Sequence, residues 1–112
     1  MKILLIGGTG TIGSKVAERL KQDNELIIAG HTSGDVQTDI TEPEAINTLF
    51  EEVGNVDTVV VTSGSAPVKP LSDSSNEDFM EGVKSKMMGQ INVALTAMDY
   101  LNEGGSVTLT SG

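Results

Sequence analysis

Glycines at positions 7, 10 and 13 give the start of the chain the spacing of a loop that binds phosphate groups. Gly7 provides a turn with a backbone conformation that other residues adopt only with strain. A side chain at position 10 would obstruct a pyrophosphate. The absence of a side chain at Gly13 lets the helix pack closely on the strand. The phosphates would meet N–H groups at the helix N-terminus, so the loop predicts a dinucleotide site. The candidate contacts are Gly7, Thr9, Gly10, Thr11, Ile12 and Gly13.

The segments that flank this loop are those that a nucleotide-binding loop requires. Residues 2–6 are apolar without alternation and predict a buried strand. Residues 11–22 predict a helix whose apolar face carries Ile12, Val16 and Leu20. A glycine turn with a purely structural role is the alternative, but the strand–turn–helix context favours nucleotide binding. A phosphate loop of the NTPase type is disfavoured because no Gly-Lys-Ser/Thr follows the glycines.

The end of the second predicted strand, at residues 26–29, bears on the choice of cofactor. An acid at this position binds the free 2′-hydroxyl of NAD, whereas a basic residue favours the 2′-phosphate of NADP. No acid occurs at positions 29–34, where His31, Thr32 and Ser33 offer hydrogen-bond donors. We therefore predict NADP as the cofactor, with NAD possible. The alternative is a polar loop with a histidine that faces solvent.

The remaining pattern alternates strands and helices over the whole chain. Strands are predicted over residues 2–6, 26–29, 35–39, 57–62 and 106–111, and helices over 11–22, 41–53 and 76–101. Such alternation favours an α/β fold, a Rossmann-like doubly wound parallel sheet of order 3-2-1-4-5 in a three-layer αβα arrangement. Ligands bind at the carboxyl ends of strands in such sheets, which adds Ser63, Gly64 and Ser65 to the candidate site.

Two sequence patterns predict capping boxes at helix N-termini. Thr41 with Glu44 predicts one, and Pro43 fits the first turn of the same helix because its missing N–H is not needed there. Ser75 with Asp78 predicts the other, at the start of the last helix.

The helix over residues 76–101 is unusually long, since about 26 residues span about 39 Å. Its apolar residues recur every three or four positions: Phe79, Val83, Met87, Ile91, Leu95, Met98 and Leu101. A methionine-rich stripe is usually core, but this length and methionines on more than one face equally favour a surface between two copies of the chain. Gly82 and Gly89 within the helix predict a close contact or a local kink.

Composition limits the classes of partner. The chain has 112 residues, which fits one domain, and a net charge of −9, which disfavours nucleic acid because phosphate contacts need Lys and Arg. It has no cysteine, so neither disulfides nor a thiolate metal site is predicted, and this suits the cytoplasm. We predict no metal site. No apolar run approaches the ~20 residues of a membrane helix, and no signal peptide is predicted.

The whole pattern resembles the short-chain dehydrogenase/reductase family in its extended and atypical branches, for which the 7–13 glycine spacing is typical. The resemblance implies that Asp39 takes the exocyclic amine of adenine while Ile40 packs on the ring. Residues 61–64 stand where the family has Asn-Asn-Ala-Gly. The catalytic candidates are Ser111, one residue before the family's catalytic serine, and Lys86, at the position of the helical Asn of Asn-x-x-Gly. Lys86 as a solvated residue is the alternative.

The resemblance covers the whole chain, but the chain corresponds to about half of such a protein. The family's Tyr-x-x-x-Lys pair is absent, and the only tyrosine, Tyr100, is predicted in the last helix. Two hypotheses follow for residues 1–112. They form the N-terminal cofactor-binding part of an NADP-dependent oxidoreductase of a small carbonyl or alcohol substrate, or a non-catalytic NAD(P)-binding or sensing module. Family members commonly dimerise through the corresponding helix, so a homo-oligomer through residues 76–101 is expected.

Overall fold

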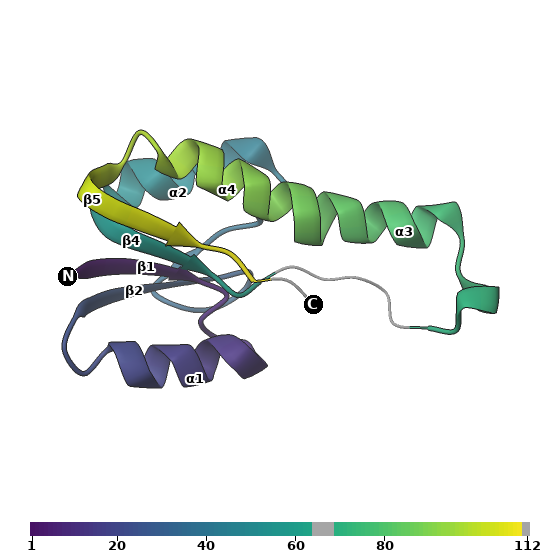
Figure 1. Cartoon of the computed structure of the whole chain (residues 1–112), viewed down its shortest axis with the longest axis horizontal. Helices are drawn as coiled ribbons and strands as arrows, with labels where there is room; N and C mark the ends of the chain where they lie inside the picture. Colours follow the sequence, from purple (N-terminus) through teal and green to yellow (C-terminus); the bar gives the residue numbers. More distant parts are fainter. Residues whose placement is uncertain (64–68, 111–112) are drawn as a thin grey trace.

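The computed structural model describes residues 1–63 and 69–110, which form a five-stranded parallel sheet between two layers of helices (Figure 1). The strands are β1 (Lys2–Ile6), β2 (Glu25–Gly30), β3 (Val36–Gln37), β4 (Val56–Val61) and β5 (Leu101–Thr108). Their order is β3-β2-β1-β4-β5, and every neighbouring pair is parallel. The predicted doubly wound sheet and its strand order are confirmed.

The helices lie on both faces of the sheet. They are α1 (Thr11–Leu20), α2 (Pro43–Val53), the short 3₁₀ turn η1 (Leu71–Asp73), α3 (Asn76–Gly82), the π-helical segment η2 (Val83–Met88) and α4 (Gly89–Ala97). α1 covers one face, and α2 and α4 cover the other (Figure 1). α3, η2 and α4 follow one another as a single rod whose α3 end extends beyond the sheet (Figure 1). Within the described ranges, no helix is both long and apolar enough to cross a membrane.

The central strands form the core because they are buried on both faces. Ile3, Leu4, Leu5 and Ile6 of β1 are each at most 1% exposed, which explains why this run lacks polar alternation. The main apolar cluster lies between the sheet and the layer of α2 and α4, with Phe50 of α2 fully buried within it. The sheet therefore holds the carboxyl ends of β1, β2 and β4 in fixed relative positions.

The buried face of α1 differs from the predicted one at Ile12, whereas Val16 and Leu20 are half-buried in line with the prediction. Ile12 is 59% exposed, whereas Gly13 and Ala17 are buried against the sheet. Small residues face the sheet here because the helix approaches the strand closely, as the glycine spacing requires. Ile12 is left beside the glycine loop, on the solvent side.

The long helix ends earlier than predicted. It stops at Ala97 rather than near Leu101, and a turn leads directly into β5. Tyr100 was predicted in the helix but lies in this turn, where its ring stacks on that of Phe50 with the ring centroids 5.3 Å apart. The aromatic contact with α2 anchors the turn that follows the helix.

Strand β5 is longer than predicted because it contains a bulge. Its pairing with β4 shifts between the residues that face Val56 and Thr58, so Gly104 and Gly105 lie within the strand rather than at a helix end. Gly104 has φ +78°, a conformation that favours glycine. The side chain of Asn102 in the bulge donates to Asp57 Oδ1 at 3.0 Å. The bulge is thus fixed by a contact between distant segments.

The large apolar side chains of the long helix face solvent, contrary to a core assignment. Phe79 is 52% exposed, Leu95 60% and Met98 70%. The buried residues of η2 and α4 are smaller or polar: Ser85, Gly89, Gln90, Val93 and Ala97. A Cβ on Gly89 would lie 2.9 Å from Cδ1 of Ile40, so Gly89 makes the close contact that its position predicted. The π-helical segment just before Gly89 is the accompanying local distortion.

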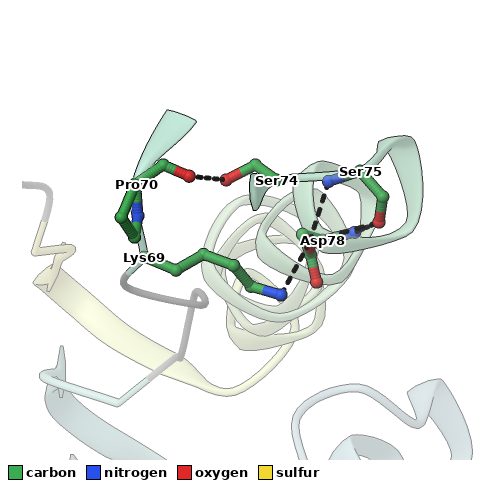
Figure 2. A network of polar contacts seen from close by, with 5 residues as sticks. All are labelled: Lys69, Pro70, Ser74, Ser75 and Asp78. Atoms are coloured by element: carbon green, nitrogen blue, oxygen red, sulfur yellow. Dashed lines mark hydrogen bonds and ion pairs between the residues drawn. The ribbon is translucent and has the colours of Figure 1, made fainter. Parts of the chain in front are cut away.

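The predicted capping box at the start of α3 is confirmed (Figure 2). The N–H of Asp78 donates to Ser75 Oγ at 3.3 Å, and the N–H of Ser75 donates to Asp78 Oδ2 at 2.8 Å. Lys69 Nζ lies 2.9 Å from the same carboxylate oxygen. The backbone hydrogen bond from Ser75, followed by the Lys69 contact, lowers the pKa of Asp78. The segment from Lys69 to Ser75 is thereby held against the outer end of the long helix.

Candidate functional site

The glycine loop joins β1 to α1 at the carboxyl end of β1. Gly7 has φ +94°, and its N–H donates to the carbonyl oxygen of Ala29 in β2 at 2.7 Å. A Cβ on Gly13 would collide with the carbonyl oxygen of Gly7, which fits the predicted close packing. A Cβ on Gly10 would contact only Gly7 O among the described residues, at an ordinary 3.5 Å. Packing therefore accounts for glycine at 7 and 13, but not at 10.

Thr62, just after β4, supports the loop from the neighbouring strand. Its hydroxyl lies 3.3 Å from the carbonyl oxygen of Ile6 and 3.2 Å from that of Gly7 and donates to them. No role was predicted for this hydroxyl, because its partners are main-chain carbonyl oxygens, which the residue types do not reveal. Thr62 is a positioning residue for the loop rather than part of its lining.

A cavity of about 330 Å³ opens at the carboxyl ends of β1, β2 and β4. Five predicted site residues line it: Gly7, His31, Asp39, Ile40 and Ser63. Six lining residues were not predicted: Ile6, Ala29, Gly30, Thr38, Thr41 and Ser85. Most of these residues lie at the end of a strand or directly after it, so the predicted strand ends and strand order could have identified them. Ser85 depends on where η2 packs, which the sequence does not show.

The other predicted residues lie elsewhere. Thr9, Gly10, Thr11, Ile12 and Gly13 belong to the loop and the start of α1, and Thr32 and Ser33 follow β2, but none of these lines the cavity. Lys86 is half-buried in η2 and does not line it, although its neighbour Ser85 does. Gly64, Ser65 and Ser111 lie outside the described residues.

Asp39 is the charged centre of the cavity. Its Oδ1 accepts hydrogen bonds from the hydroxyl of Thr41 at 2.7 Å and from the Thr41 N–H at 2.9 Å. The hydroxyl bond, then the backbone bond and the charges of His31 and Lys84, hold the pKa of Asp39 below its usual value. His31 Nε2 lies 3.7 Å from Asp39 Oδ2. Asp39 is therefore ionised throughout the neutral range.

These contacts of Asp39 also correct the prediction for α2. Thr41 does not form a capping box with Glu44, because its hydroxyl is engaged by Asp39. The residue before the helix is Glu42, which makes no capping bond with its side chain, and Pro43 occupies the first turn as predicted.

Ser63 lines the cavity and carries a buried hydroxyl. Its Oγ is buried and has no hydrogen-bond partner among the described residues. A buried polar atom left unpaired is unfavourable by about 1–3 kcal/mol. Since the residue lines the cavity, a polar group of a bound ligand is the natural partner for it.

The fold and this site define a class of protein. The glycine loop precedes a helix N-terminus, and the cavity lies beside the point where the strand order reverses, between β1 and β4. That combination is the dinucleotide site of Rossmann-type domains. Among residues 1–63 and 69–110, no group of three or more His, Cys, Asp or Glu side chains is placed to hold a metal ion.

Comparison with known proteins gives the family. The model of the NAD dependent epimerase/dehydratase family matches residues 3–103. The chain therefore belongs to this NAD(P)-dependent family and, as its sequence predicted, to the short-chain dehydrogenase/reductase type.

Several relatives are similar over much of the chain. Hydroxynaphthalene reductase arp2 of Aspergillus fumigatus is 38% identical over 80 residues, covering 68% of this chain and 29% of that protein. The crystal structure of the Listeria innocua protein lin1944 is 49% identical with a TM-score of 0.97, covering 100% of this chain and 56% of that one. A small-chain dehydrogenase in complex with NADPH is 30% identical with a TM-score of 0.89, covering 100% and 51%. The chain thus spans about half the length of these structures, and less of the reductase.

Proposed function

We propose that residues 1–112 form the cofactor-binding part of a cytoplasmic, NADP-dependent oxidoreductase that acts on a small carbonyl or alcohol substrate. The observation that carries the proposal is the cavity at the carboxyl ends of the central strands. It is lined by Gly7 of the glycine loop, by an ionised Asp39 and by Ser63, whose hydroxyl has no partner among the described residues. Membership of an NAD(P)-dependent family supports it, as does the NADPH complex of a relative that is 30% identical.

Each part of the site has a role in this proposal. The N-terminus of α1 receives the pyrophosphate, because its N–H groups are unpaired and its dipole favours anions. Asp39 accepts a hydrogen bond from the exocyclic amine of adenine, and Ile40 packs on the ring. His31 lies beside the adenosine ribose. The bound cofactor supplies the hydride. Ser111 and Lys86 are the proposed groups on the substrate side.

Calorimetry tests whether the site binds a dinucleotide. We expect heat of binding when the folded protein is titrated with NADPH, and weaker binding with NADH. Circular dichroism of the same sample establishes that it is folded. A folded sample that gives no heat with oxidised or reduced NAD or NADP would contradict the proposal.

The alternative function is a non-catalytic NAD(P)-binding or sensing module on the same fold, since the fold alone does not decide activity. Both functions predict cofactor binding, so hydride transfer distinguishes them. The full-length protein is assayed for NADPH oxidation with a panel of aldehydes, ketones and quinones. Turnover favours the oxidoreductase, and tight binding without turnover favours the sensing module.

We predict that preference for NADP over NAD increases as the pH falls from about 8 to about 6, because protonation of His31 adds positive charge near the 2′-phosphate. Asp39 stays charged over this interval because its pKa is lowered. Its carboxylate, 3.7 Å from His31 Nε2, offsets part of the added positive charge and limits the effect to a fewfold change. The measurement is the ratio of the two dissociation constants at each pH. His31→Gln, which stays neutral, is the control and should show no such trend. An unchanged ratio in the wild-type protein would exclude His31 from phosphate recognition.

We further propose a homo-oligomer that forms through the outer face of the helix from residue 76 onward. Large apolar side chains are exposed along α3, η2 and α4: Phe79, Met80, Met87, Met88, Ile91, Leu95 and Met98. A run of this kind is larger than the scattered apolar residues of an ordinary surface.

Leu95→Glu, in the second half of α4, is expected to shift the protein toward monomer in sedimentation velocity, because the interface would have to bury a charge. Ile12→Glu is the matched control: Ile12 is 59% exposed in α1, which covers the opposite face of the sheet (Figure 1), and the change should leave the association unaltered. A wild-type protein that stays monomeric over a wide concentration range would contradict the oligomer.

A further inference from the structure

Gln90 is a buried amide on the otherwise small, apolar inner face of α4. It is 4% exposed. Its Nε2 donates to the carbonyl oxygens of Thr110 at 2.7 Å and of Ser63 at 3.3 Å, and its Oε1 accepts from the Thr110 N–H at 3.0 Å. A carboxamide has two N–H donors and an acceptor oxygen, and all three functions are used here.

The amide takes the place of main-chain pairing where β4 and β5 end. The last backbone pair is Val60 with Thr108, and beyond it the groups of Ser63 and Thr110 still require partners. Gln90 supplies them from the helix side, while the hydroxyl of Thr110 donates to the carbonyl oxygen of Val61 at 2.7 Å. The two strand ends are therefore both bonded to the same side chain of α4.

This position matters for the second half of a dinucleotide. Such ligands lie across the point where the strand order reverses, here between β1 and β4. His31 and Asp39 mark the adenosine half, on the side of β2 and β3, so the other half extends toward β4 and β5. We infer that Gln90 is a positioning residue that fixes the ends of β4 and β5 at the separation which the nicotinamide half requires. The inference rests on the proposed function.

Gln90→Met tests this role, since methionine has a similar volume and no hydrogen-bonding amide. Two probes separate the halves of the site: 2′,5′-ADP, which contains only the adenosine half, and NADPH. We expect the affinity for NADPH to fall about tenfold, because more than one hydrogen bond is lost. The affinity for 2′,5′-ADP should stay within about twofold of the wild-type value. Hydrogen exchange of the Thr110 amide should accelerate by a similar factor. Gln22→Met, at an exposed glutamine after α1, is the matched control and should change none of these values.

A second variant keeps the test decisive if Gln90→Met does not fold. Thr110→Val removes only the hydroxyl that bonds to Val61 and should weaken NADPH, but not 2′,5′-ADP, by a smaller factor. Equal weakening of both probes, or unchanged NADPH affinity with faster Thr110 exchange, would overturn the inference while the proposed function stands. A folded wild-type protein that binds neither probe would overturn the proposed function and this inference together.

Discussion

Gly10→Leu is expected to abolish dinucleotide binding while the domain stays folded. The Cβ at this position meets only Gly7 O among the described residues, at 3.5 Å, and Gly10 has φ −82°, which any residue adopts. Leucine is less favourable than glycine at a helix N-cap, so we expect a loss of about 1 kcal/mol in the free energy of unfolding. The side chain would occupy the place where the pyrophosphate approaches the N–H groups of α1. The measurement is calorimetry with NADPH, with urea unfolding of the same sample.

Gly13→Ala is the informative comparison for Gly10→Leu. Its added Cβ would collide with the carbonyl oxygen of Gly7, so the loop and α1 must separate. Overpacking of this kind usually destabilises by about 1–3 kcal/mol, and more where backbone atoms must move. Binding should be lost in both variants, but stability mainly at position 13. Retained NADPH affinity in a folded Gly10→Leu protein would show that the phosphates do not lie over this loop.

The strands of the sheet were predicted well because short runs of adjacent residues indicate them. Residues 3–6 are apolar without alternation and residues 58–62 are all β-branched, and such runs are typical of central parallel strands. Strand order followed from right-handed crossovers between alternating elements. The part of the site that depends on this order was also predictable: His31, Asp39 and Ser63 follow β2, β3 and β4 at the same edge of the sheet, and all line the cavity.

What the sequence did not predict depends on contacts between distant segments. The long helix has apolar residues at helical spacing on two faces, and the larger ones were candidates for the core. The observed inner face has small residues because Gly89 packs directly on Ile40, which is far away in the chain. The bulge in β5 likewise depends on the hydrogen bond between Asn102 and Asp57. The link between the ends of β4 and β5 depends on the hydrogen bonds of Gln90. Periodicity alone does not reveal which face a tertiary contact will select.

The 112-residue chain by itself is expected to bind the cofactor without transferring hydride at an enzymatic rate. Carbonyl reduction needs a hydride donor, a group that polarises the oxygen and an acid that supplies the proton. Tyr100 stands just before β5, at the opposite end of the strand from the cavity, with its ring stacked on Phe50. In the proposed function His31 lies at the adenosine side, and none of the described tyrosine or lysine side chains lines the cavity. We therefore expect no efficient proton donor for the substrate among residues 1–63 and 69–110.

General acid catalysis contributes about 10²–10⁴-fold, so its absence should leave at most a trace rate. The measurement is NADPH oxidation by the purified chain with a panel of ketones, aldehydes and quinones. Calorimetry on the same sample establishes that the cofactor is bound, so that a lack of turnover does not reflect an empty site. Turnover above about 1 s⁻¹, within the ordinary enzyme range, would contradict the prediction. Lys86→Met and Ser111→Ala would then be the first variants to test, because these residues are the remaining candidates on the substrate side.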